Sequence, residues 1–157
     1  MTDTPQFLAE RLKAEGEKSV TFFNEMPPDQ WERTVYTEGT CWTVHQVLAH
    51  FVATESSIER LMRNILGGGS GAPEDFNIDA YNERKVAAIQ DSSPDELLDE
   101  FQRLRAGMVT FVAGLSPEDL TRKGRHPWLG ETELVEVVKL LYRHNQIHQR
   151  DVRKLIG

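Results

Sequence analysis

The sequence has few of the features that mark secreted, membrane-spanning or disulfide-bonded proteins. It contains one cysteine, Cys41, so no disulfide can form within the chain, which fits a reducing compartment. No apolar run approaches the roughly 20 residues that a transmembrane helix needs. Residues 1–19 are polar and charged, unlike a signal peptide. We therefore expect a cytoplasmic protein with no membrane partner.

Positive charge is also scarce. The 18 Lys and Arg residues are outnumbered by 25 Asp and Glu residues, which gives a formal net charge of −7. Binding to a nucleic-acid backbone needs clustered Lys and Arg, so we do not expect a nucleic-acid partner. The composition, 39% hydrophobic and 27% charged over 157 residues, is that of an ordinary globular protein. We expect a single domain over residues 1–157.

Strand patterns are missing as well, and helical patterns take their place. The one β-like run, residues 34–37, is too short to carry a sheet, and residues 122–130 are expected to be a loop. Helical periodicity and capping signals predict long helices that begin at Pro5, after Thr43, after Ser93 and near Thr132, with a further segment from about Asp79. The sequence therefore predicts an all-α fold, a four-helix bundle with a long crossover connection.

The crossover begins with a glycine-rich segment, Gly67–Gly71, which ends the second predicted helix near Leu66. Such a composition gives a flexible connection. It could be a plain linker or a mobile lid over a site, and the plain linker is the favoured interpretation.

The last predicted helix carries an unusual apolar stripe, in which two positions hold histidines. Residues spaced by three and four share one helical face, and the stripe comprises Leu134, Val137, Leu141, His144, His148, Val152 and Leu155. The two imidazoles therefore point the same way, about one turn apart. They are either metal ligands or core histidines with hydrogen-bond partners.

A third histidine can meet this pair from the second predicted helix. His45 and His50 lie five residues apart, so only one of them can face the bundle interior. His50 follows the apolar face, whereas His45 falls away from it. Three imidazoles from two helices leave coordination positions open, as in a catalytic or ligand-binding centre. Zinc, nickel, copper and iron all suit such a nitrogen set.

Two segments resemble the signatures of the DinB/YfiT-like superfamily. They are Trp42–His50, reading WTVHQVLAH, and the pair His144-x-x-x-His148. The resemblance implies a four-helix bundle with a divalent metal ion, nickel or zinc, on His50, His144 and His148. It also implies a homodimer, and a small-molecule substrate with a low-molecular-weight thiol as a possible co-substrate.

We accordingly expect a divalent-metal-dependent enzyme of the thiol-dependent transferase or hydrolase type. The alternative is a non-catalytic metal-containing protein with a binding or stress-response role, and a third reading is a metal-free bundle with core histidines. Thiol transfer would favour cations near the site mouth, for which Arg84, Arg125 and Arg143 are candidates.

Other polar residues have less specific interpretations. Thr54, four residues after His50, is expected to face the site, and a group after the glycine-rich segment could line a pocket mouth: Asp79, Tyr81 and Asn82. Asp79 could equally be a helix N-cap. Four further residues have structural or surface roles as the favoured interpretation: Glu55 as a surface carboxylate, Asp151 as a solvated residue that pairs with a nearby arginine, His126 as loop packing, and Cys41 as a buried thiol. The alternatives are a carboxylate that orients an imidazole for Asp151, a general base for Glu55 and a soft metal ligand for Cys41.

Overall fold

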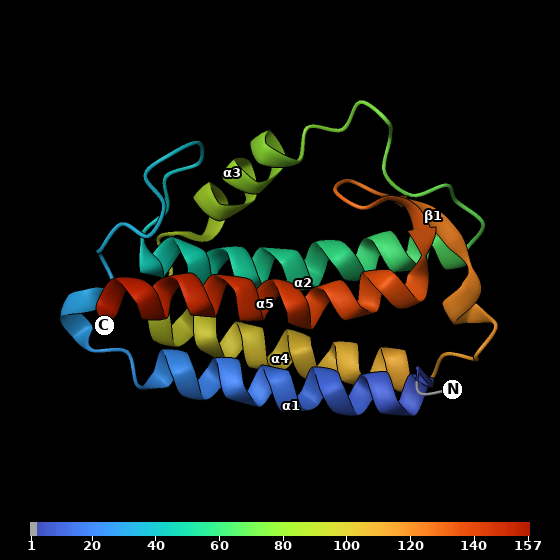
Figure 1. Cartoon of the computed structure of the whole chain (residues 1–157), viewed down its shortest axis with the longest axis horizontal. Helices are drawn as coiled ribbons and strands as arrows, with labels where there is room; N and C mark the ends of the chain where they lie inside the picture. Colours follow the sequence, from blue (N-terminus) through green and yellow to red (C-terminus); the bar gives the residue numbers. More distant parts are fainter. Residues whose placement is uncertain (1–2) are drawn as a thin grey trace.

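The computed structural model describes residues 3–157 and has four long helices that pack side by side as a bundle (Figure 1). They are α1 (Pro5–Asn24), α2 (Val44–Leu66), α4 (Pro94–Ala113) and α5 (Leu134–Ile156). This confirms the predicted all-α bundle. None of these helices is long and apolar enough to cross a membrane.

The helices are connected so that neighbours are not all antiparallel. α1 and α5 run in one direction along the bundle, and α2 and α4 run in the other (Figure 1). α4 packs between α1 and α2, while α5 closes the other side against the same two helices. Because α2 and α4 are parallel, the chain must return along the whole bundle between them. That crossover contains α3 (Ile78–Ile89), which lies outside the bundle over α2.

Capping residues set where the helices begin. The Thr43 hydroxyl accepts from Gln46 N, and the Gln46 side chain accepts from Thr43 N, which completes the predicted capping box of α2. Ser93 and Glu96 form the same arrangement at α4. The N-cap of α3 is Asn77, whose Oδ1 accepts from Ala80 N at 3.0 Å. Asp79 is therefore not the cap, because it lies within the first turn of the helix.

A short β-hairpin replaces the loop that was expected before α5. β1 (Lys123–His126) pairs antiparallel with β2 (Gly130–Glu133). The prediction was wrong because four-residue strands are too short to show alternation. The hairpin packs closely against α2, since a Cβ on Gly124 would lie only 2.4 Å from Ile65. Its turn ends at Gly130, where φ is +76°. Two 3₁₀ turns also occur, at Pro28–Gln30 and Asp119–Thr121.

The hairpin also holds the glycine-rich segment in place. Arg125 N donates to Ser70 O at 2.9 Å, and Ala72 N donates to Arg125 O at 2.8 Å. Gly71 N donates to the Asn64 side chain, which ties the same segment to α2. A Cβ on Gly71 would meet the Arg125 backbone at 2.5 Å, so glycine is required for this close approach. The expected flexible connection is thus bonded to its neighbours on both sides.

The bundle interior contains two apolar clusters with a layer of polar side chains between them. One cluster, around Leu12, Met62, Met108 and Leu141, lies toward the hairpin end. The other lies toward the opposite end and includes Phe23, Phe51, Phe101 and Val152. The layer between them draws buried polar residues from all four helices: Glu15, Ser19, Glu55, Arg105, Asn145 and Gln149.

Arg105 of α4 is the centre of this polar layer. Its guanidinium donates to both Glu55 oxygens at 2.6 and 3.0 Å, to Asn145 Oδ1 at 2.6 Å and to Leu12 O at 3.0 Å. One side chain therefore joins all four helices. Glu55 is 2% exposed, so its expected surface position was wrong. Gly16 makes room for the arginine, since a Cβ there would lie 2.7 Å from Arg105 Cγ.

Candidate metal centre

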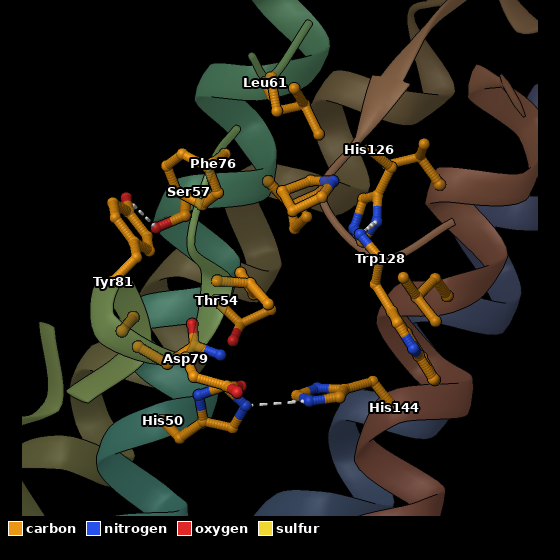
Figure 2. A pocket seen from close by; sticks show the side chains of 18 of the residues that line it. His50, Thr54, Ser57, Leu61, Phe76, Asp79, Tyr81, His126, Trp128 and His144 are labelled. Atoms are coloured by element: carbon orange, nitrogen blue, oxygen red, sulfur yellow. Dashed lines mark hydrogen bonds between the residues drawn. The ribbon is translucent and has the colours of Figure 1, made fainter. Parts of the chain in front are cut away.

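Three histidine side chains from α2 and α5 converge beside the polar layer. The Nε2 atoms of His50 and His144 are 2.9 Å apart, and those of His144 and His148 are also 2.9 Å apart. All three rings can offer ligand atoms that lie within 4.8 Å of one another. Figure 2 shows His50 and His144 facing each other across the gap between α2 and α5. The predicted meeting of these histidines is therefore found in the structure.

The surroundings keep the three imidazoles neutral. Burial lowers the pKa of His144 to about 3 and that of His148 to about 4, and it holds the pKa of His50 well below its usual value. His50 also packs against Trp42, with 4.6 Å between ring centroids. A neutral imidazole keeps a lone pair, which is the form that binds a metal ion.

Tyr36 and Asp151 fix which nitrogen of His148 carries the proton. The Tyr36 hydroxyl lies 2.6 Å from Asp151 Oδ2 and 2.7 Å from His148 Nδ1. Because a carboxylate only accepts, the hydroxyl donates to Asp151 and accepts from Nδ1–H of His148. The lone pair of His148 is then on Nε2, toward the other two rings. Asp151 thus orients an imidazole through Tyr36, which is the less favoured of its two expected roles, and it also pairs with Arg150 at 3.7 Å, which is the favoured one.

The close nitrogen contacts are hard to satisfy with hydrogen bonds alone. Nε2 of His144 meets two other Nε2 atoms, and Nε2 of His148 carries no proton. A proton on Nε2 of His144 can be donated fully to only one of its two neighbours, whereas a proton on Nε2 of His50 leaves the lone pairs of His144 and His148 facing each other at 2.9 Å. A cation would accept all three lone pairs. Neutral imidazole nitrogens are ligands that divalent ions such as zinc accept, so the donor set fits a divalent ion.

The other ring nitrogens lack the partners that commonly orient metal ligands. Nδ1 of His50 and Nδ1 of His144 are buried without a hydrogen-bond partner among residues 3–157. Packing therefore holds these two rings, through Trp42 on His50 and Phe51 beside His144. His148 differs from the other two histidines because its Nδ1 is linked through the Tyr36 hydroxyl to the Asp151 carboxylate. Hydrogen bonds of this kind orient metal-binding histidines and raise their basicity.

A cavity of about 620 Å³ opens onto the histidine cluster. α2 and α5 form two walls, α3 and the segment before it form a third, and the hairpin turn with His126 and Trp128 adds a further wall (Figure 2). Its walls are largely apolar and include Leu61, Phe76, Trp128 and Leu140. Thr54 lines it, as expected, and so do Asp79, Tyr81 and Asn82, which were candidates for the pocket mouth. A volume of this size is typical of small-molecule sites.

Several other expectations are changed by the structure. Cys41 is exposed rather than buried. The three candidate cations do not line the cavity: Arg125 pairs with Glu74, Arg143 with Glu136, and Arg84 stacks on Tyr81. Arg60, which was not considered, does line it and donates to the Tyr81 hydroxyl at 2.9 Å. His45 lies away from the cluster and contacts Ser92 O, as expected.

Comparisons with known proteins agree with this architecture. A relative from Bacillus mycoides strain KBAB4, provisionally named a metal-dependent hydrolase, is 31% identical over 116 residues. The match covers 73% of this chain and 64% of the relative, so it spans less than two thirds of that relative's length.

Three solved structures share the fold at low identity. YfiT from Bacillus subtilis, described as a probable metal-dependent hydrolase with an unusual four-helix bundle topology, has a TM-score of 0.71 at 19% identity, covering 96% of this chain and 83% of YfiT. A mycothiol-dependent maleylpyruvate isomerase gives 0.72 at 13%, covering 94% and 59%. The colibactin self-resistance protein ClbS, solved with double-stranded DNA, gives 0.74 at 11%, covering 97% and 96%.

The sequence model of the DinB superfamily matches residues 11–152, which include all four bundle helices in whole or in large part. The match contains His50, His144 and His148 as well as Tyr36 and Asp151. On this match the chain belongs to the DinB superfamily.

Proposed function

We propose that this protein is a divalent-metal-dependent enzyme in which His50, His144 and His148 hold the metal ion. The observation that carries the proposal is the convergence of three Nε2 atoms at the wall of a cavity of about 620 Å³. Nickel and zinc are the ions we favour, since both bind neutral imidazole nitrogen. When bound, such an ion supplies Lewis-acid chemistry, polarising a carbonyl group or lowering the pKa of a water or thiol.

The residues of this chain would prepare the cavity for that chemistry. The largely apolar walls favour the apolar part of a small substrate. Tyr36 and Asp151 hold the lone pair of His148 toward the cluster. Thr54 rises from α2 next to His50, where its hydroxyl can donate to or accept from a bound molecule (Figure 2).

Hydrolysis is the reaction that we propose first, and thiol-dependent transfer is the second candidate. The apolar cavity and the provisional name of the Bacillus relative favour hydrolysis of an ester or amide with an apolar body. Arg60 favours the second candidate, because a cation at the cavity wall could bind an acidic group of a low-molecular-weight thiol.

A non-catalytic metal-binding role is the remaining alternative. Asp79 is the one carboxylate that lines the cavity among the described residues, and it is exposed to solvent. The cavity thus offers no buried carboxylate as a general base. The cytoplasmic location and the homodimer stay predictions, and so does the absence of a nucleic-acid partner, which is supported by the net charge of −7.

Turnover by metal-loaded protein tests the proposed function. The protein is loaded with nickel or zinc and assayed with 4-nitrophenyl butyrate, and separately with a low-molecular-weight thiol and an aryl halide. Ester hydrolysis that disappears on chelation and returns with metal supports the first candidate. Thiol conjugation with the same metal dependence supports the second. Bound metal without either activity would favour the non-catalytic alternative.

Replacing Tyr36 by Phe is expected to weaken metal binding by about 10- to 100-fold, as loss of an outer hydrogen-bond partner typically does. The phenyl ring fills the same space but can neither accept from His148 Nδ1–H nor donate to Asp151. Tyr81→Phe is the matched control, because Tyr81 lines the same cavity but bonds Ser57 and Arg60. Calorimetric titration with zinc should separate the two variants; equal affinities would contradict the role of Tyr36.

A further inference from the structure

His126 is a buried histidine that lies outside the three-histidine cluster. It is the last residue of β1 and is 6% exposed. Its Nδ1 accepts hydrogen bonds from two backbone groups of the hairpin turn, Trp128 N at 3.0 Å and Leu129 N at 3.1 Å. A nitrogen that accepts from two N–H donors holds its lone pair there. The proton of the neutral ring is therefore on Nε2.

This ring is a fixed hydrogen-bond donor. Taking up a second proton would place Nδ1–H against the two backbone N–H groups, and burial also lowers the pKa of His126 to about 4. His126 lines the cavity, and its Nε2 has no hydrogen-bond partner among residues 3–157. In Figure 2 the ring lies beside Trp128, above His144 and across the cavity from Thr54. The turn thus aligns a donor for a molecule in the cavity.

The neighbouring walls indicate what kind of molecule could accept this hydrogen bond. Leu61, Phe76 and Trp128 are apolar neighbours in the same cavity (Figure 2). An apolar wall disfavours a full charge that lacks a partner, whereas it tolerates a carbonyl oxygen that receives a hydrogen bond. The volume of about 620 Å³ accommodates a body of two fused rings or an equivalent aliphatic group.

We propose that His126 is a ligand-binding residue whose Nε2–H donates to the carbonyl oxygen of an apolar molecule in the cavity. The inference rests on the proposed function in one respect: the molecule that His126 binds belongs to the substrate class of the same site. The hydrogen bond itself needs no metal ion, so the two proposals can fail separately.

A pair of probes of equal size isolates the hydrogen bond. 2-Acetylnaphthalene carries a carbonyl oxygen, and 2-ethylnaphthalene has nearly the same shape without it. Loss of one hydrogen bond of about 1 kcal/mol corresponds to about a fivefold change in affinity. We therefore compare the ratio of the two binding affinities, ketone over hydrocarbon, with the ratio of the two octanol–water partition coefficients. For wild-type protein the first ratio should exceed the second by at least about fivefold, both as purified and after chelation of metal.

Two variants separate donation to the ligand from support of the turn. In His126→Asn, Oδ1 replaces Nδ1 as acceptor for the turn, but no N–H reaches the position of Nε2. The ketone preference should disappear, while affinity for 2-ethylnaphthalene and the melting temperature stay near the wild-type values. In His126→Gln, the terminal amide replaces Nε2–H, so the preference should persist although the turn is weakened.

Three results would contradict the inference. Retention of the full ketone preference by His126→Asn would show that His126 serves only the turn. Failure of wild-type protein to bind either probe would exclude the cavity as a site for apolar molecules. If His126→Asn does not fold, His126→Gln decides, and loss of the preference in a folded glutamine variant counts against the inference. A ketone preference in wild-type protein without metal-dependent turnover would instead contradict only the proposed function.

Discussion

Replacing Arg105 by Met lowers the free energy of unfolding by about 3–5 kcal/mol, the range typical when one partner of a buried ion pair is removed. The Arg105 and Glu55 side chains are 5% and 1% exposed, so the carboxylate would stay buried without its partner. The same change also removes donors to Asn145 Oδ1 and Leu12 O. Urea unfolding followed by circular dichroism measures the effect.

Arg103→Met is the matched control for this prediction. Arg103 lies on the same helix, is exposed, and pairs with Glu100 at the surface, so its replacement should change stability by less than about 1 kcal/mol. The double variant Glu55→Met with Arg105→Met removes both charges and should recover the part of the loss that comes from the unpaired Glu55 carboxylate. Equal stability of the two single arginine variants would contradict the role of the buried layer.

Replacing His148 by Ala should abolish tight binding of nickel and zinc. The variant loses one of the three converging nitrogens, together with the ring that Tyr36 and Asp151 orient. The loss should exceed the about 10- to 100-fold effect of removing an outer partner alone. His50→Ala and His144→Ala should behave in the same way, because each ring supplies one nitrogen to the cluster.

His45→Ala is the control for the histidine variants. His45 is on the same helix as His50 but bonds to Ser92 O, outside the cluster. Its replacement should leave metal content and affinity unchanged in calorimetric titrations. Unchanged metal binding in His148→Ala would remove His148 from the metal site, even if the fold and the cavity were intact.

The sequence predicted the bundle and the histidine cluster because both follow from helical periodicity. Stripes and caps locate the helices, and the positions of His50, His144 and His148 on apolar faces place them inside the bundle. The crossover connection follows from the same pattern, since its glycine-rich segment and α3 separate two long helices. A metal ligand that replaces a core residue in a stripe is visible without knowledge of its partners.

The residues that sequence reasoning misplaced depend on contacts across the chain. Glu55 is buried because Arg105, fifty positions later, neutralises it, and neither residue alone differs from a surface residue. The orienting role of Asp151 was not favoured because its partner Tyr36 lies in the segment between α1 and α2, far away in the sequence. The role proposed for His126 depends on a three-residue turn in a hairpin whose strands are too short to show a pattern. Only tertiary structure supplies such pairings.

Elemental analysis tests the central claim most directly. The full chain should be purified without a histidine tag and without added metal, then analysed for nickel, zinc, copper and iron. The account predicts about one divalent ion per chain in wild-type protein and none in His148→Ala. Wild-type protein that contains no metal, and takes up none from nickel or zinc solutions at neutral pH, would show that the three histidines are core residues and would contradict the proposed metal centre.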